Sequence, residues 1–116
     1  MRRVIIESPC SGKNTAETDR HRAYALRAMR HSLAMNEAPL LSHVLYAWSG
    51  ALDDNKPTER ELGMRAGFAW GSVADGVVVY TDYGISPGMR EGIGIALKRS
   101  IKPIEYRSIG VNREEL

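Results

Sequence analysis

Val4-Ile5-Ile6 is a short run of β-branched residues that predicts a buried strand, and it leads into the polar loop Glu7-Ser8-Pro9-Cys10-Ser11-Gly12-Lys13. Asn14-Thr15-Ala16-Glu17 has the form of a capping box, so a helix should begin there. A second apolar run, Val77-Val78-Val79-Tyr80, is also followed by a turn and a helical segment. Continuous apolar strands that alternate with helices indicate a parallel sheet covered on both faces.

The segments between and after these runs complete the alternation. We predict helices from Asn14 to about Asn36 and over residues 57–71 and 88–100, and strands over residues 4–6, 38–42, 77–80 and 103–106. In the first helix, Leu26, Met29 and Leu33 should form the apolar stripe that faces the sheet. Residues 43–56 are expected to be an irregular loop. The predicted fold is a small doubly wound, Rossmann-like or flavodoxin-like α/β domain with about four parallel strands and three helices.

Composition supports a single domain. A chain of 116 residues leaves little room for a second one, so we expect one domain over residues 1–110 and a polar tail over 111–116. No stretch approaches the roughly 20 apolar residues of a membrane helix, and membrane binding is not expected. The single cysteine, Cys10, fits a reducing compartment, and a cytoplasmic location is expected. A net charge of +2 does not favour a sequence-specific nucleic-acid binder.

The fold places three loops, residues 7–14, 43–56 and 82–88, at the carboxyl edge of the sheet, where doubly wound domains bind ligands. The first loop is not a nucleotide-hydrolysing phosphate loop, because Glu7 stands where its first glycine should be and Asn14 follows the lysine. Its helix N-terminus still offers backbone N–H groups to an anion or a ribose. The alternative is an ordinary solvated connection.

The third loop has similar features. Ser86 can cap the helix that follows, and Gly88 allows the backbone to approach a ligand. Arg90 in the first turn would be held by a ligand phosphate, or is simply a surface arginine. His43 should lie at the same edge, as a ligand contact or as a structural histidine. The candidate ligand-binding residues are Ser8, Pro9, Ser11, Gly12, Lys13, Asn14, His43, Asp82, Tyr83, Ser86, Pro87, Gly88, Met89 and Arg90.

No metal and no cofactor are expected. His21 and His31 are ten residues apart on one helix and cannot share a metal ion, and Cys10 has no second cysteine beside it.

Several of these residues carry a resemblance to a known family. Ser8-Pro9 after the first strand, Ala74-Asp75 before the strand at Val77, then Asp82 and Ser86-x-Gly88 at a helix start, resemble the nucleoside 2-deoxyribosyltransferase-like family, which includes short phage and bacterial proteins. The resemblance implies a Rossmann-like fold, a nucleoside or nucleotide pocket at the strand ends and, often, a homo-oligomer.

The resemblance breaks at the catalytic residue. In the enzymes of that family the nucleophile is a glutamate four residues after the helix-opening glycine, and here that position is Gly92. Glu91 is one residue earlier, about 100° around the helix. We therefore predict non-catalytic binding of a nucleotide or a nucleotide-derived signal, as in a phage protein that sequesters a host immune signal (a sponge) in the host cytoplasm.

Two other interpretations remain open. One is a nucleoside or nucleotide N-glycosidase or 2-deoxyribosyltransferase that uses Glu91, Glu7 or Asp82 as its carboxylate. The other is an interaction module without a small-molecule ligand. The rows Gly63/Gly67/Gly71 and Gly88/Gly92/Ala96 allow close helix packing within the domain or between subunits, and a homo-oligomer is expected.

Overall fold

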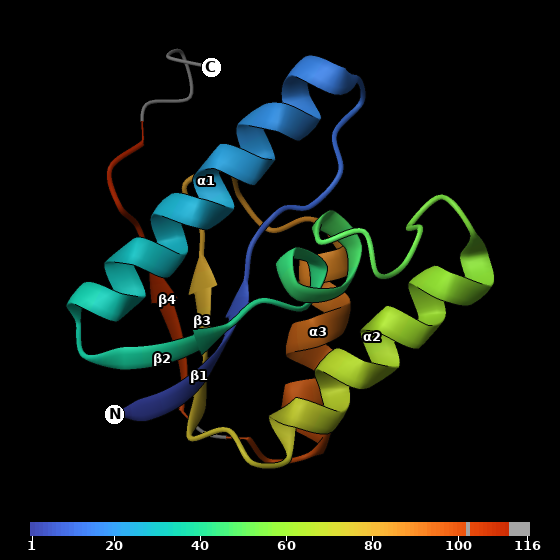
Figure 1. The fold of residues 1–116 in the computed structure, drawn as a ribbon. Coiled ribbons are helices and arrows are strands. Elements are labelled where there is room, and N and C mark those ends of the chain that lie inside the picture. Colours follow the sequence, from blue (N-terminus) through green and yellow to red (C-terminus); the bar gives the residue numbers. More distant parts are fainter. Residues whose placement is uncertain (102, 112–116) are drawn as a thin grey trace.

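The structure is a computed structural model that describes residues 1–101 and 103–111. Its elements are β1 (Arg2–Glu7), α1 (Thr15–Ala34), β2 (Glu37–Leu40), η1 (His43–Trp48), α2 (Pro57–Gly71), β3 (Gly76–Tyr80), α3 (Pro87–Lys98) and β4 (Ile104–Arg107) (Figure 1). The predicted α/β fold, with four parallel strands, is confirmed. Most of the predicted tail, residues 112–116, lies outside the described residues.

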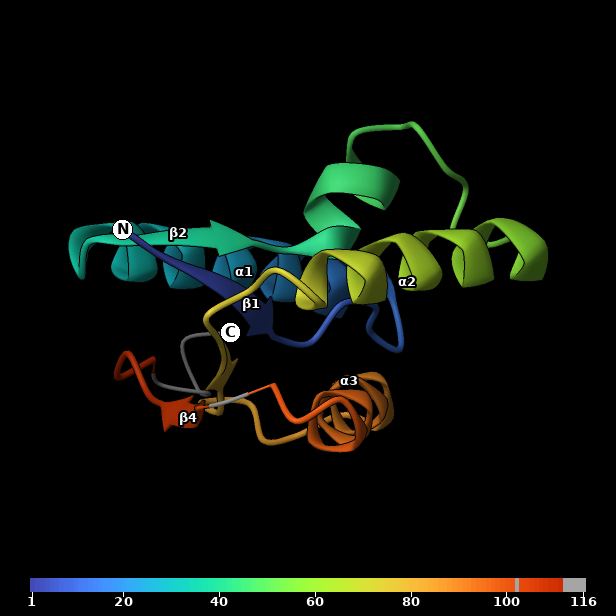
Figure 2. The same cartoon turned by 90° about the horizontal axis from the view of Figure 1, so that it is seen from below.

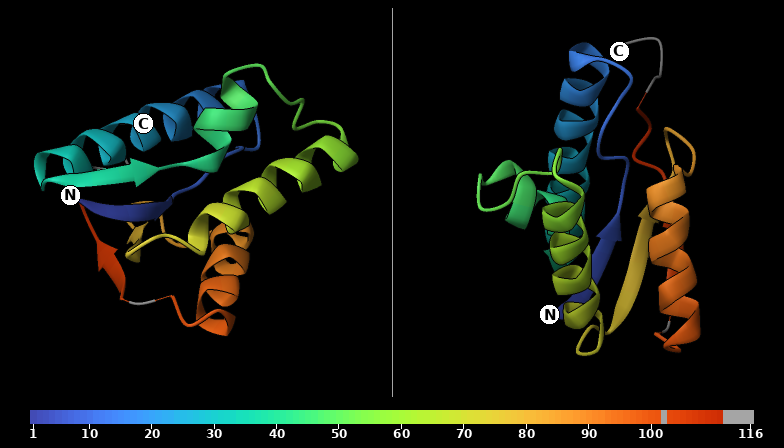
Figure 3. Two further views of the ribbon diagram at one scale, coloured as in Figure 1. Left: turned by 60° about the horizontal axis from the view of Figure 1, so that its bottom comes forward. Right: turned by 90° about the vertical axis from the view of Figure 1, so that its right-hand side faces the viewer.

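The strand order is β2-β1-β3-β4, and all three pairings are parallel. The chain moves outward from β1 to β2 and then crosses back to β3, so the direction of winding reverses between β1 and β3. Helix α1 consequently covers one face of the sheet, and α2 and α3 lie together on the other (Figures 1 and 2). In the right-hand view of Figure 3, β1 and β3 lie between α1 and α3.

Alternation along β1 divides the core into two clusters. Val4 and Ile6 point toward α1, where they pack with Tyr24, Ala25 and Ala28. Ile5 packs instead with the cluster of Val77, Val79, Met89, Ile93 and Ala96 on the α3 side. By the same alternation Glu7, two residues after Ile5, faces α3 at the end of the strand.

The predicted apolar stripe of α1 is wrong at Leu26 and Leu33, whereas Met29 packs against the core as predicted. Leu26 and Leu33 are 53% and 51% exposed, while the buried residues of the helix are Tyr24, Ala25, Ala28 and Ser32. Three of these four are small, which lets α1 lie close to the sheet, so Leu26 and Leu33 remain on its outer side. The period of the helix alone does not distinguish these two faces.

The predicted irregular loop at 43–56 is also wrong in its first half, because His43–Trp48 form the π-helix η1. The glycine row of α2 packs against this part of the chain. A Cβ on Gly67 would lie 2.8 Å from Cβ of Ser42, and one on Gly63 would lie 3.2 Å from Leu52. The row therefore serves close packing within the domain.

The boundaries of α2 match the predicted ones, and those of the other helices and strands differ from the prediction by at most two residues. Pro39 lies inside β2 and not at its start. Strand β2 is at the edge of the sheet, where a residue without a backbone N–H is tolerated because one side of the strand has no neighbour to bond. In the described part of the chain, no helix has the length and apolarity required to cross a membrane.

Candidate functional site

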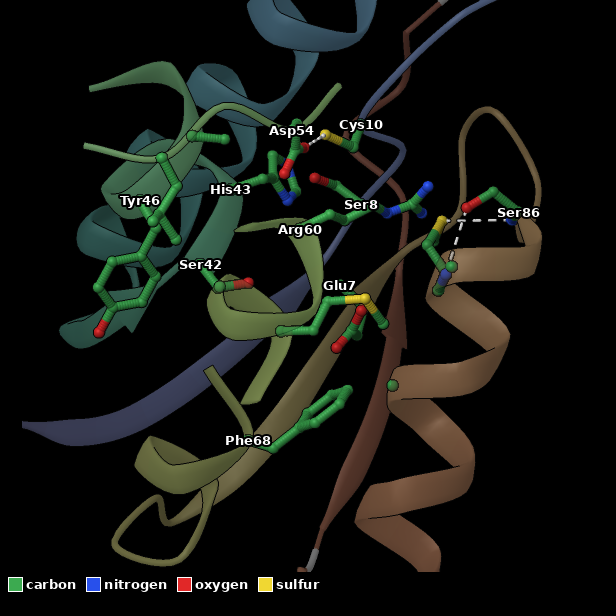
Figure 4. Close-up of a pocket in the computed structure, with 17 residues that line it drawn as sticks. Glu7, Ser8, Cys10, Ser42, His43, Tyr46, Asp54, Arg60, Phe68 and Ser86 are labelled. Carbon is green, nitrogen blue, oxygen red and sulfur yellow. Dashed lines mark hydrogen bonds between the residues drawn. The ribbon is translucent and has the colours of Figure 1, made fainter. Parts of the chain in front are cut away.

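A pocket of about 110 Å³ opens at the carboxyl end of β1, where the winding direction of the sheet reverses. Parallel sheets bind ligands at this topological switch point. Its walls come from five parts of the chain (Figure 4). These are the end of β1 and the residues after it (Glu7, Ser8 and Cys10), the start of η1 (Ser42, His43), the following loop (Leu52, Asp54), α2 from Arg60 to Phe68, and the first turns of α3 with its cap Ser86. The pocket thus joins segments that are far apart in the sequence.

Two acidic residues line this pocket: Asp54 is exposed, and Glu7 is half-buried with its carboxyl group facing the interior between α2 and α3. The Glu7 carboxylate accepts no hydrogen bond and no ion pair from any of the described residues. Burial without a compensating partner disfavours the ionised form and raises the pKa of Glu7 to about 8. At neutral pH the side chain is therefore mainly protonated, and it can donate a hydrogen bond.

Gly92 makes room for Glu7. A Cβ on Gly92 would lie 2.3 Å from Oε2 and 2.6 Å from Cδ of Glu7, so the carboxyl group occupies the space of any side chain at position 92. Figure 4 shows Glu7 between Phe68 of α2 and the α3 helix. The carboxyl group of Glu7, at the end of β1, therefore occupies the place that a side chain of α3 at position 92 would take.

Two more polar groups in the pocket have no partner in the described part of the chain. Oγ of Ser8, in a residue that is 4% exposed, and Nε2 of His43 are both buried and unbonded. Burial lowers the pKa of His43 to about 4, so its ring is neutral at pH 7. Buried polar atoms are nearly always satisfied in native proteins, and such exceptions need an explanation such as a ligand or water.

His43 is held in place by aromatic packing. Its ring meets Trp48 edge-on, with 4.8 Å between the centroids, and the Arg22 guanidinium lies 4.9 Å from the centre of the Trp48 ring. This stack joins η1 to α1. It fixes the orientation of the histidine without using its free nitrogen.

Charged groups lie at the mouth of the pocket. Asp54 accepts a long contact from the Cys10 thiol, with 3.9 Å between Oδ2 and Sγ. Burial and the nearby Asp54 raise the pKa of Cys10 to about 11, so the thiol is not a nucleophile at neutral pH. Arg60 extends from α2 toward Ser8 (Figure 4) and forms no salt bridge with any described residue.

The structure brings together five of the predicted ligand-binding residues, Ser8, His43, Ser86, Gly88 and Met89, and adds Glu7 from the alternative interpretation. The predicted residues outside the pocket are Pro9, Ser11, Gly12, Lys13, Asn14, Asp82, Tyr83, Pro87 and Arg90. Glu91 does not line this pocket; it borders an adjoining hollow that shares Arg60, Met64 and Phe68 with the pocket. Prediction from sequence missed the contribution of α2, because neither Arg60 nor Phe68 lies in a loop that follows a strand.

The predicted anion site before α1 has its donors occupied. The backbone N–H of Gly12 donates to Oγ1 of Thr18, and that of Lys13 donates to the Glu17 carboxylate. Asn14 caps the helix as predicted, since its Oδ1 accepts from the backbone N–H of Glu17. A ligand at this loop would have to replace these bonds, and the site stays a prediction.

Asp82 and Tyr83 lie on the α1 side of the sheet. The Asp82 carboxylate accepts hydrogen bonds from Tyr24 and from the segment 108–111. Tyr83 packs edge-on against Tyr24 with 4.6 Å between the ring centroids, and its buried hydroxyl has no partner in the described part of the chain. Ser86 caps α3 as predicted, because its Oγ accepts from the backbone N–H of Met89.

Comparison with known proteins supports this fold. No curated protein matches the chain in sequence. A solved structure of a 2-deoxyribosyltransferase from the psychrotolerant bacterium Bacillus psychrosaccharolyticus is similar, with a TM-score of 0.63 and 12% sequence identity over 97% of this chain and 78% of that one. At this identity the likeness is one of fold. A family model described as a domain of unknown function, DUF7768, matches residues 2–107, and the chain belongs to that family.

Proposed function

We propose that the pocket beside Glu7 binds a nucleoside or a nucleotide-derived small molecule and releases it unchanged. The observation that carries this proposal is the pair of buried, unpartnered groups in the pocket, Ser8 Oγ and His43 Nε2. Each leaves hydrogen-bonding capacity unused at the switch point of the sheet, and a polar ligand would satisfy both. The likeness in fold to a 2-deoxyribosyltransferase favours a nucleoside as the class of ligand.

The size of the pocket supports partial enclosure of such a ligand. Pockets that enclose a whole drug-sized molecule measure roughly 300–1,000 Å³, and this one measures about 110 Å³. It suits a fragment such as a pentose, with the base or phosphate at the mouth near Arg60. We propose a homo-oligomer in which a second subunit covers the exposed part of the ligand.

Binding without turnover follows from the position of the carboxylates. Gly92 stands where the resemblance places the nucleophilic glutamate, and Glu91 lines only the adjoining hollow, on the other side of Arg60, Met64 and Phe68. A protein that binds a nucleotide signal and leaves it intact can act as a sponge, and we propose this role, in the cytoplasm of an infected host, for a phage-encoded chain.

A mass-balance experiment tests the proposal. The protein is incubated with nucleosides, linear nucleotides and cyclic nucleotides, freed of unbound ligand and denatured, and the released molecules are identified by mass spectrometry. An intact ligand near one per pocket is the expected result. Ser8→Ala should reduce its recovery, while Asp19→Asn on the exposed side of α1 is the matched control. Failure of every compound to bind would contradict the proposal.

One observation favours a second candidate, an N-glycosidase or 2-deoxyribosyltransferase. The Glu7 carboxyl group fills the space at Gly92, so a carboxyl group is present beside the first turns of α3 although the helix does not supply it. In an enzyme of this kind Glu7 would approach the anomeric carbon of the bound sugar. Free base that accumulates with time in the same experiment, and is abolished by Glu7→Gln, would establish this alternative.

A further inference from the structure

Exposed charged groups, Asp54 and Arg60, lie at the mouth of the pocket, whereas the enclosed part around Glu7, Ser8 and His43 is polar and uncharged when Glu7 keeps its proton. The titratable or charged side chains that line the pocket come from each surrounding element: Cys10 after β1, His43 and Tyr46 from η1, Asp54 from the following loop and Arg60 from α2. Helix α3 and its N-cap Ser86 contribute only uncharged residues, Ser86, Gly88, Met89 and Gly92.

None of these groups compensates a negative charge on Glu7. His43 is neutral, Cys10 is a thiol, and Arg60 forms no hydrogen bond or salt bridge with Glu7. An ionised carboxylate that is buried without a donor or a cation is strongly disfavoured, so the carboxyl group keeps its proton. The absence of a side chain at Gly92 allows the group to stay in this position.

We infer that Glu7 recognises the ligand in its protonated form, by donating a hydrogen bond to an uncharged acceptor such as a hydroxyl or ring oxygen of a sugar. Ser8 Oγ and His43 Nε2 provide two further unpartnered hydrogen-bonding groups and no charge, so the inside of the pocket selects a neutral, hydroxyl-rich group over a cationic one. Gly92 is the residue on which this arrangement depends. The inference rests on the proposed function and names the part of the ligand that enters the pocket.

Protonation of Glu7 makes the affinity for the ligand depend on pH, and the direction of the change distinguishes a neutral ligand from a cationic one. A ligand that needs the O–H donor binds more weakly as pH rises and Glu7 ionises. A cationic ligand would favour the ionised carboxylate and bind more tightly over the same range. With half-ionisation near pH 8, a ligand that requires the proton should bind about 30-fold more weakly at pH 9.5 than below pH 7.

The experiment uses carbon-13-labelled glutamate, with the Glu7 carboxyl signal assigned by its loss in Glu7→Gln. The chemical shift of this signal is followed from pH 5 to 10, without ligand and with millimolar ribose 5-phosphate as the probe, and the midpoint of its titration is determined. We expect a midpoint near pH 8 that rises with the probe. Probe affinity should fall about 30-fold between pH 7 and 9.5 in the wild type and less than about twofold in Glu7→Gln.

Glycine variants on α3 isolate the positioning of Glu7. Gly92→Ala places a methyl group against the carboxyl group and should displace it, lowering the midpoint and weakening the probe. Gly94→Ala is the matched control, because a Cβ there meets no atom within 4 Å, and it should change neither quantity.

The outcomes separate the inference from the proposed function. A midpoint near the ordinary glutamate value, a downward shift with the probe, or the same pH profile in Glu7→Gln would each overturn the inference while leaving nucleotide binding intact. If neither ribose 5-phosphate nor any nucleotide of the mass-balance panel perturbs the pocket signals at any pH, the proposed function itself fails.

Discussion

Two carboxylates stand at the carboxyl ends of the neighbouring strands β1 and β3, on opposite faces of the sheet, and their surroundings differ completely. Asp82 accepts hydrogen bonds from the hydroxyls of Tyr24 and Ser108, at 2.5 and 2.6 Å, and from three backbone N–H groups of residues 109–111. Glu7 accepts none from the described residues. The same chemical group is saturated on the α1 side and unsatisfied on the α3 side.

This difference separates a structural site from a binding site. Burial alone would raise the pKa of Asp82, but the hydrogen bonds from Ser108, Tyr24 and the backbone outweigh it and hold that pKa below its ordinary range. The charge on Asp82 therefore fastens the segment 108–111 to the sheet. Glu7 has its pKa raised for want of such partners, and a ligand can supply them.

Asp82→Ala should have the largest effect on stability. It removes the acceptor for the segment 108–111 and leaves the Tyr24 hydroxyl and the partly buried N–H groups of Ile109 and Val111 unpaired, so we expect a loss of about 3 kcal/mol in the free energy of unfolding. Urea denaturation at pH 7 measures the loss, and hydrogen exchange should show that the amides of residues 109–111 lose protection. Asp19→Asn is the exposed control. If Asp82→Ala were as stable as the wild type, the hydrogen bonds to Asp82 would not stabilise the folded protein.

The pH dependence of this contribution follows from the lowered pKa. The Asp82 contribution is complete above the ordinary aspartate pKa and is lost as pH falls below it. Asp82→Ala should therefore lose less stability, relative to the wild type, in acid than at pH 7.

Glu7→Gln should have the next largest effect, with the opposite sign. Because folding raises the pKa of Glu7 from 4.5 to about 8, the wild type loses stability as pH rises through this interval, and the loss is complete above it. Glutamine does not ionise. We expect Glu7→Gln to be more stable than the wild type by about 2–3 kcal/mol at pH 9, after allowance for the opening of the pocket to solvent, and close to it at pH 4.5.

Guanidinium denaturation at the two pH values provides the measurement. The lowered pKa of His43 destabilises the folded protein as pH falls from 6.5 toward 4, so the pH 4.5 arm compares the two proteins with each other at that pH and not with their own stability at pH 9. Equal stabilities at pH 9 would mean that Glu7 is already ionised and partnered in the folded protein.

The sequence predicted the sheet because each strand carries its own apolar run, and these runs alternate with helical segments. It also predicted both caps, Asn14 and Ser86, since capping is local chemistry. It did not distinguish Glu7 from Asp82. Whether a carboxylate finds donors depends on segments that are distant in the chain, such as residues 108–111 for Asp82.

The composition of the pocket was predictable only in part. Ser8, His43 and Ser86 follow or flank strand ends, and the rule for parallel sheets places them together. Arg60 and Phe68 lie in the middle of α2, and they reach the pocket because the glycine row lets that helix pack closely against the Ser42 end of η1. The error in the α1 stripe has the same origin, since small residues allow close approach but give a weak hydrophobic signal.

Alanine substitutions at Gly92 and Gly94 of α3 test how closely the Glu7 carboxyl group is packed. Alanine favours a helix over glycine by up to about 1 kcal/mol, and Gly94→Ala should gain part of this because the space around it is open. Gly92→Ala should instead be destabilised by about 1 kcal/mol, because the added methyl group displaces the Glu7 carboxyl. Thermal unfolding of the two variants measures the difference. Equal gains would show that Glu7 moves aside without cost.

The smallest expected difference between paired variants comes from two buried serines, one with its hydrogen bond satisfied and one without. Ser32 is 0% exposed and donates to the Glu37 carboxylate at 2.8 Å, whereas Ser8 is 4% exposed and its hydroxyl has no partner in the described residues. Ser32→Ala removes a hydrogen bond to a charged group and should cost about 1.5 kcal/mol. Ser8→Ala removes a hydroxyl that contributes no bond to the folded state, so its stability should stay within about 0.5 kcal/mol of the wild type.

Denaturation at pH 7 compares the stabilities of the two variants. The nucleotide panel should show the reverse order, with weaker binding in Ser8→Ala and unchanged binding in Ser32→Ala. If Ser8→Ala proved the less stable variant, the Ser8 hydroxyl would have a partner within the fold, and the α3 side of the sheet would be a structural site like the one around Asp82.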